Sequence, residues 1–162
     1  MRRSLMAVVA LCIALLPPVA GATDTTDTEP QVYFFWSASC SFSRSALSFL
    51  QGAQSKDPKL QVRDFEVDNS LSNTLLLGKV YDKIGLPEFW VVPLIVVGHH
   101  LIIGYNDAET TGRDVLNHVA ECRKTGCKDM VRDLIGEPRT YDEASAAASV
   151  KSTICTSLQR QP

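Results

Sequence analysis

A short apolar run that leads directly into a cysteine is the feature that most constrains the fold. The segment Gln31–Trp36 (QVYFFW) is β-branched and aromatic and is bounded by a Ser/Ala turn, which favours a buried strand over a helix. After Cys40, apolar residues recur at helical intervals as far as Ala53, and Gly52 and Pro58 mark the exit from this predicted helix. The pattern therefore places Cys40 close to a helix N-terminus.

The remaining apolar segments predict a compact α/β domain. Strands are expected at Leu60–Val67, Leu94–Val97 and Leu101–Tyr105, and helices at Leu71–Ile84 and around Val115, Val119 and Cys122. With the first strand and helix, the order becomes strand, helix, strand, helix, strand, strand, helix (βαβαββα). This order is typical of a central sheet flanked by helices.

Composition and charge limit the function classes. The chain is 45% hydrophobic and 21% charged, which argues against a disordered, collagen-like or polytopic membrane protein. The net charge of -2 is too small to favour nucleic acid as a partner. We expect residues 31–135 to form one domain, residues 23–30 a flexible leader, and residues 136–162 a polar tail that is poorly ordered or loosely packed.

The first 22 residues are expected to be a cleaved signal peptide. Two arginines precede the apolar run Leu5–Leu16, and Pro17-Pro18 end that run before Ala20-Gly21-Ala22. The run is shorter than the about 20 residues of a transmembrane helix. We expect cleavage after Ala22 and a mature chain without a membrane span. We therefore expect an exported protein that resides in the periplasm. Secretion and the lumen of a secretory organelle are the alternatives.

Cysteine usage fits an oxidising compartment. Cys12 would leave with the signal, and the four cysteines that remain must pair, bind metal or react. Cys122 and Cys127 flank a predicted helix end and a glycine turn, which can bring their Cα atoms to the about 4.4–6.8 Å that a disulfide needs. We expect this pair to be bonded. The states of Cys40 and Cys155 stay open.

The position of Cys40 favours a reactive thiol. At a helix N-terminus, unpaired N–H groups and the helix dipole stabilise a thiolate. The alternative is a small, inert, buried core residue. The Ser/Ala turn before Cys40 favours the nucleophile.

Several short motifs occur in order along the chain. They are Phe35-Trp36, Cys40-Ser41-Phe42-Ser43, Phe65-Glu66-Val67, Val92-Pro93, Gly104-Tyr105 and Ala108–Gly112, followed by Cys122 and Cys127. On these residues, the chain from Gln31 to about Met130 resembles the thioredoxin superfamily, most closely its exported thioredoxin- and glutaredoxin-like domains with a Cys-Pro-His-Cys active site. The resemblance implies a thioredoxin-like fold with a mixed four-stranded sheet, a cis Pro93 beside Cys40, and a substrate groove formed by Trp36, Val92 and Pro93.

Ser43 departs from the resembled motif, because it stands where the second active-site cysteine would be. In the usual cycle the first thiolate attacks a substrate disulfide and the second cysteine resolves the mixed disulfide. Three alternatives follow: Cys40 works as a monothiol exchanger or isomerase, the fold keeps only a peptide-binding groove, or Cys155 supplies the resolving thiol. Ser43 could also hydrogen-bond the Cys40 thiolate.

The expected function is an exported monothiol (C-x-x-S) thiol–disulfide oxidoreductase or isomerase. Its partners would be protein or peptide thiols and disulfides, with glutathione as a further candidate, and its oligomeric state is left open. The alternative is a redox-inactive thioredoxin-fold binding module of the cell envelope. Phe89 and Trp90 would form either an apolar wall beside the site or part of the core.

No cofactor or metal is expected. His118, Cys122 and Cys127 lie close in sequence and His99-His100 add donors, but their spacing does not match a zinc motif. We expect His118 on an exposed helix face and His99-His100 in a solvated turn.

Overall fold

The structure, a computed structural model, describes residues 29–87, 90–135 and 154–155. The expected signal peptide, the leader as far as residue 28, Phe89 and most of the polar tail lie outside these residues. Within the described part of the chain, no helix is both long enough and apolar enough to cross a membrane.

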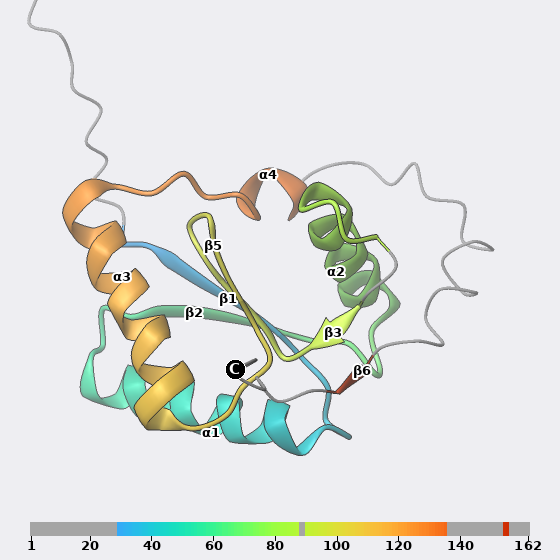
Figure 1. Ribbon diagram of the computed structural model, residues 1–162, viewed down its shortest axis with the longest axis horizontal. Coiled ribbons are helices and arrows are strands. Elements are labelled where there is room, and N and C mark those ends of the chain that lie inside the picture. Colours follow the sequence, from blue (N-terminus) through green and yellow to red (C-terminus); the bar gives the residue numbers. More distant parts are fainter. Residues whose placement is uncertain (1–28, 88–89, 136–153, 156–162) are drawn as a thin grey trace, which may run out of the picture.

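A four-stranded mixed sheet forms the centre of the domain (Figure 1). Its strands are β1 (Gln31–Trp36), β2 (Gln61–Glu66), β4 (Leu94–Val97) and β5 (His100–Ile103), in the spatial order β2-β1-β4-β5. β1 runs parallel to β2 and antiparallel to β4, and β4 runs antiparallel to β5. The α/β class and the flanked four-stranded sheet expected from the sequence are thus confirmed.

The helices start and end close to the expected positions. They are α1 (Ser41–Lys56), α2 (Leu71–Lys83), α3 (Arg113–Thr125) and the short α4 (Arg132–Ile135), with a π-helical turn, η1 (Ala108–Gly112), before α3. Ser70 caps α2, since its hydroxyl accepts a hydrogen bond from the backbone N–H of Asn73. The η1 turn is a difference from the sequence prediction, and it leads directly into α3, which starts two residues before Val115.

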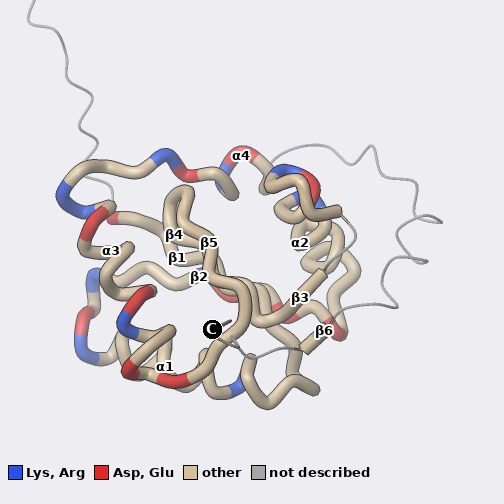
Figure 2. Tube along the Cα trace, viewed as in Figure 1, with Lys and Arg blue, Asp and Glu red and all other residues tan. Residues whose placement is uncertain are grey.

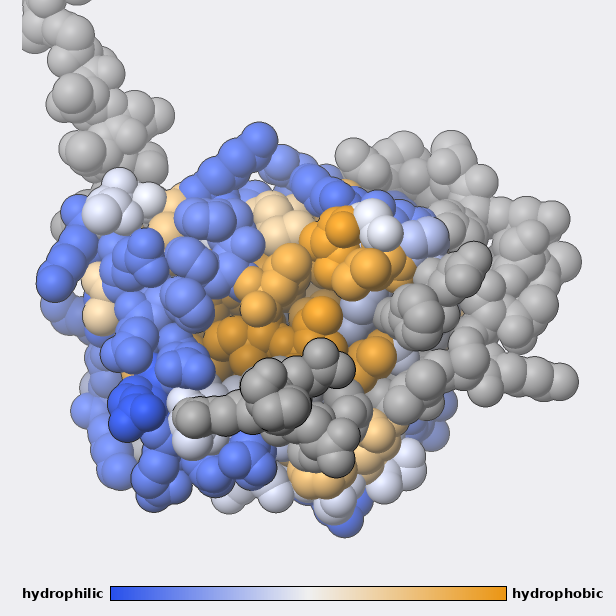
Figure 3. Space-filling model, in the orientation of Figure 1, coloured by the Kyte–Doolittle hydropathy of each residue, from blue (hydrophilic) through white to orange (hydrophobic). Residues whose placement is uncertain are grey.

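Alternating side chains of the central strands build two cores. Val32 and Phe34 of β1 join the core under α1 and α3, whereas Tyr33 and Phe35 join the core under α2. This period of two is that of a sheet buried on both faces. In Figure 3, apolar side chains gather around the middle of the viewed face, in the region of β3, β5 and α2, and hydrophilic residues lie towards α3.

A second, two-residue pairing lies beside the main sheet. β3 (Val91–Val92) pairs in parallel with β6 (Ile154–Cys155), so that Val92 lies opposite Cys155. The sequence does not predict β6, because two residues carry no measurable periodicity. This pairing returns the end of the described chain to the neighbourhood of Cys40.

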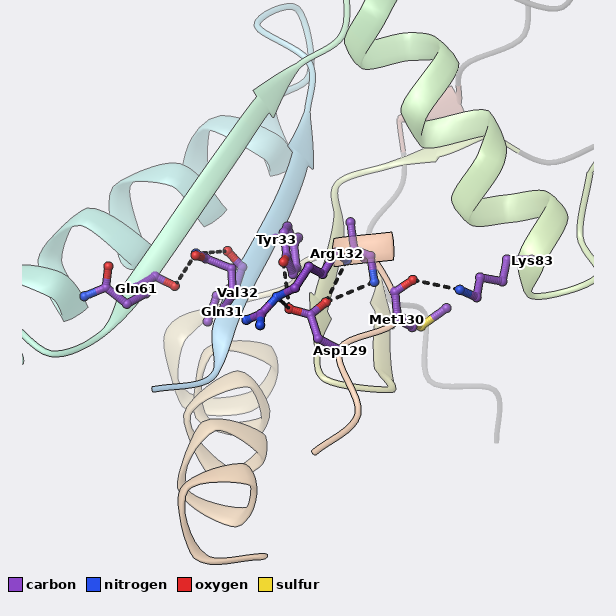
Figure 4. Close-up of polar contacts among 9 residues, drawn as sticks. Gln31, Val32, Tyr33, Gln61, Lys83, Asp129, Met130 and Arg132 are labelled. Atoms are coloured by element: carbon purple, nitrogen blue, oxygen red, sulfur yellow. Dashed lines mark hydrogen bonds and ion pairs between the residues drawn. The ribbon is translucent and has the colours of Figure 1, made fainter. Parts of the chain in front are cut away.

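The segment after α3 is anchored through Asp129 (Figure 4). Its Oδ2 accepts a 2.7 Å hydrogen bond from the Tyr33 hydroxyl and lies 3.3 Å from Nε of Arg132. Its Oδ1 accepts from the backbone N–H of Arg132 at the start of α4. Burial first, then the bond to Asp129, raises the pKa of Tyr33 to about 12.

Candidate functional site

Cys40 occupies the N-cap of α1, at the end of a tight turn that follows β1. Its backbone N–H donates to the carbonyl of Ser37 at 3.2 Å, which closes the turn. No acidic residue lies in the first turn of α1. The helix N-terminus therefore acts on the Cys40 sulfur without a carboxylate of its own to oppose it.

Cys40 is bonded to Cys155, and their Cα atoms are 5.6 Å apart. Cys40 is 2% exposed, whereas Cys155 is exposed. The resemblance left this pairing open, and the structure brings the two cysteines together across 115 residues of chain. In this oxidised form no thiolate is present at the site.

The Val92–Pro93 peptide bond is cis and lies beside the disulfide. The Cys40 Sγ is 3.9 Å from the carbonyl oxygen of Val92, and the Pro93 carbonyl accepts from the backbone N–H of Gly104 at 2.7 Å. Because Val92 also pairs with Cys155, the strand β6 lies along the backbone that the resemblance assigns to substrate.

Ser43 faces the turn before Cys40. It is fully buried, and its Oγ accepts a 3.3 Å hydrogen bond from the backbone N–H of Ser37. The hydroxyl thus supports the turn that carries Cys40. Trp36 stacks on Phe34 and donates from Nε1 to Asp64 on β2 at 3.0 Å, so its described contacts lie along the sheet.

Asp68 organises the same turn, a contact that the local sequence pattern does not indicate. Its Oδ2 accepts from the Ser37 hydroxyl at 2.8 Å and from the backbone N–H of Ser39 at 3.1 Å. From the other side, the Arg44 guanidinium donates to the Ala38 carbonyl at 2.8 Å. Asp68 follows β2, and the parallel pairing of β2 with β1 is the signal that could have predicted this contact.

The other two cysteines form a separate disulfide. Cys122 and Cys127 are bonded with their Cα atoms 4.9 Å apart, around the end of α3 and the positive-φ Gly126. Cys122 is buried in the core under α1 and α3. This disulfide ties α3 to the segment that follows it.

Trp90 belongs to the core. It is 4% exposed, its ring lies against Gly78 of α2, and its Nε1 donates to the Pro87 carbonyl. These are the contacts of a core residue and not those of an apolar wall beside Cys40.

The expected solvated turn is confirmed for His99, which is exposed between β4 and β5, whereas His100 and His118 are half-buried against each other. His99, His100 and His118 are the three histidines of the chain, and they lie together. The rings of His100 and His118 stack with centroids 3.9 Å apart, because the β4–β5 hairpin packs against α3. Burial first, then the neighbouring His118 and His99, lowers the pKa of His100 below its ordinary value. Linear spacing hides this cluster, since β5 and α3 are separated in sequence.

The chain was compared with known protein families and with curated proteins. No family model matches it, and no curated protein matches it either.

Proposed function

We propose that this chain is an exported thiol–disulfide exchange protein with a thioredoxin-like fold. In this proposal Cys40 is the nucleophile and Cys155 takes the part of the resolving cysteine that Ser43 lacks. The observation that carries the proposal is the Cys40–Cys155 disulfide, formed at a helix N-cap and beside the cis Pro93.

The architecture supports this assignment. The sheet order β2-β1-β4-β5, with one parallel and two antiparallel pairings, has Cys40 at the end of the turn that follows β1 and Pro93 directly before β4. β1 and β4 are neighbours, which explains why two residues 53 positions apart meet at one site. Arg44 and Asp68 bring opposite charges to the turn before Cys40, so the support for a thiolate comes from the position of Cys40 at the N-cap of α1.

The exchange is a two-step transfer between sulfurs. In the reduced protein, the Cys40 thiolate attacks a substrate disulfide, forms a mixed disulfide and releases one substrate thiolate. The Cys155 thiolate then attacks the Cys40 sulfur, releases the second substrate thiolate and forms the Cys40–Cys155 disulfide. Two electrons pass to the substrate, and an external dithiol or glutathione returns the protein to its reduced state.

The expected substrates are extended peptides or small molecules that carry a disulfide. When the Cys40–Cys155 bond is reduced, β6 is no longer held to β3, and the backbone of Val91 and Val92 becomes available for pairing. A strand added at such an edge gains main-chain hydrogen bonds with little dependence on sequence.

The test compares the Cys155→Ser and Cys40→Ser variants with the reduced wild-type protein. We expect Cys40 to react with alkylating reagents at pH values well below the ~8.5 of an ordinary thiol. With a disulfide peptide, Cys155→Ser should accumulate the mixed disulfide on Cys40 rapidly, whereas Cys40→Ser should form one only slowly, on the exposed Cys155 thiol. Mass spectrometry of the acid-quenched protein measures both species.

Two further variants sharpen the result. The Cys122→Ser/Cys127→Ser double variant removes the other disulfide and should leave exchange at Cys40 intact. Adding Ser43→Cys to Cys155→Ser should restore resolution, because positions 40 and 43 lie within one helical turn, about 5–6 Å apart. The exchange proposal fails if reduced Cys40 is no more reactive than a thiol in the unfolded chain.

The alternative is a redox-inactive binding module in which the same disulfide is structural. The near-complete burial of Cys40 favours it. In that case millimolar glutathione should leave the Cys40–Cys155 bond intact unless the chain unfolds, whereas an exchange protein should equilibrate with glutathione while folded.

A further inference from the structure

All three histidines of the chain and one glutamate meet at a corner between β5 and α3. His118 and Glu121 lie three residues apart on α3, so they share one helix face. His100, at the start of β5, lies opposite them, with its Nε2 3.4 Å from Oε2 of Glu121. The same carboxylate oxygen is 3.5 Å from Nδ1 of His118.

We propose that His100, His118 and Glu121 form a binding site for a divalent transition-metal ion of the zinc type. The three donor atoms lie within 4.8 Å of one another. Two imidazole nitrogens and one carboxylate oxygen suit zinc, copper or nickel, whereas calcium and magnesium prefer sites made of oxygen atoms. A water molecule would complete a four-coordinate site.

A buried nitrogen without a partner is the second observation behind this site. The Nε2 of His100 is out of contact with solvent and has no hydrogen-bond partner among the described residues. The Glu121 oxygen lies within ion-pair distance of it but is not aligned for a hydrogen bond. A buried polar atom left in this way is costly, and a bound cation would satisfy it.

His118 must turn out of its stack on His100 before the donors can converge, because the in-plane lone pairs of two nearly parallel rings do not meet at one ion. Zinc bonds of about 2.0–2.1 Å in a tetrahedron place ligand atoms about 3.3 Å apart. The side chains of His118 and Glu121 are 31% and 53% exposed and can rotate, while that of His100 is only 18% exposed. His118 and Glu121 would therefore move towards the ion, while the fold already holds His100 in place.

The neighbouring Cys122–Cys127 disulfide means that the proposed metal site belongs to the oxidised protein. The Cys127 sulfur lies within 4.8 Å of donor atoms of His99 and His100, but it is bonded to Cys122 and offers no thiolate. The same bond holds Cys122, the neighbour of Glu121, in the core. The three proposed ligands therefore form the site in the oxidised protein, independently of any reaction at Cys40.

The experiment titrates zinc chloride alone into the purified, untagged, oxidised protein and follows the heat of binding. We expect one zinc ion per chain. His118→Ala and Glu121→Gln should each weaken zinc binding by more than about tenfold. Loss of a residue that only supports a metal ligand already costs about tenfold or more, and a direct ligand should cost at least as much. Both positions are partly exposed, so these variants should keep the fold, which circular dichroism checks.

Glu109→Gln is the matched control, since Glu109 is an exposed glutamate on η1. It should bind zinc as the wild type does, and magnesium should not compete. The proposal is overturned if the wild type binds no zinc, or if the His118→Ala/Glu121→Gln double variant binds it as tightly as the wild type.

Discussion

Gly98 marks a close approach between the β4–β5 turn and the Cys122–Cys127 disulfide. Its φ is +60°, and a Cβ at this position would lie 2.5 Å from the Cβ of Cys127. The carbonyl of Gly98 also accepts from the backbone N–H of Met130. Both the backbone conformation and the space therefore require glycine here.

Gly98→Ala should destabilise the protein more than Gly85→Ala. Gly85 has a φ of +77° but nothing within 4 Å of a Cβ, so its substitution should cost only the about 1–2 kcal/mol of a left-handed residue. Gly98→Ala adds a clash with a side chain that a disulfide holds in place. Urea denaturation measures the free energies of unfolding, and equal losses would contradict the close approach.

Three buried tyrosines predict how stability changes in alkali, and burial raises the pKa of each of them, Tyr105 included. Burial raises the pKa of both Tyr33 and Tyr81 to about 12, and at Tyr33 the Asp129 carboxylate contributes as well. In the unfolded chain all three hydroxyls ionise near their ordinary value of 10.0. The folded state thus holds these protons where the unfolded state loses them, and this stabilisation is complete only below about pH 10.

The free energy of unfolding should fall steeply between pH 10 and about 12. Tyr33→Phe should make the fall shallower in this window, because only Tyr81 and Tyr105 among the described tyrosines then contribute. Urea denaturation at stepped pH, with tyrosinate absorbance as a second signal, follows both effects. A variant with the slope of the wild type would show that Tyr33 ionises equally in the folded and unfolded states.

At the scale of elements, two helical glycines differ in what surrounds them. A Cβ on Gly78 of α2 would lie 2.6 Å from the Trp90 ring, whereas nothing lies within 4 Å of a Cβ on Gly52 of α1. The first glycine lets α2 approach the tryptophan. The second has no such packing role, and it weakens its helix.

Opposite effects are expected from the same substitution in these two helices. Gly52→Ala should stabilise the protein by about 0.5–1 kcal/mol through helix propensity. Gly78→Ala should destabilise it by about 1–3 kcal/mol, because the added methyl overpacks the core at Trp90. Thermal and urea unfolding measure both. If Gly78→Ala is also stabilising, α2 and Trp90 do not pack as described.

Local patterns predicted the elements well and the contacts between them less well. Short apolar runs rich in β-branched and aromatic residues located β1 and β4 to within a few residues, and helical spacing did the same for α1 and α2. The hydrogen bonds of Asp68 and the ring contact between His100 and His118 depend on which elements become neighbours. β6 depends on a disulfide and a pairing of two residues, neither of which leaves a periodic pattern in sequence.

Across the whole molecule, Arg123 connects three distant parts of the chain. From the last turn of α3, its guanidinium reaches Glu29 before β1 at 2.7 Å and Asp57 after α1 at 2.8 Å. The hydrogen bond from Arg123 is the main cause that lowers the pKa of Asp57 below its ordinary value of 3.8. More generally, Figure 2 shows charged residues along the helices and their connections, whereas the segment from β3 through β5 carries none.

Arg123→Met should reduce stability at neutral pH, and the reduction should shrink in acid. The Asp57 contribution is present above pH 3.8 and is lost as the pH falls through the lower value of the folded state. Lys124→Met, at the neighbouring exposed cation, is the control and should show less effect. Denaturation curves at several pH values and salt concentrations test this, and a loss insensitive to both would contradict an ionic connection.

The long separation between the two bonded cysteines has a consequence for biosynthesis. Cys155 is the twentieth residue after Ile135, and a ribosome adds that many residues in about one to four seconds at about 5–20 residues per second. Apart from β6, the strands and helices around Cys40 are complete by Ile135. Every new copy therefore passes through an interval in which Cys40 has been made and its partner has not. During that interval any other thiol or disulfide nearby competes with the chain's own tail for Cys40.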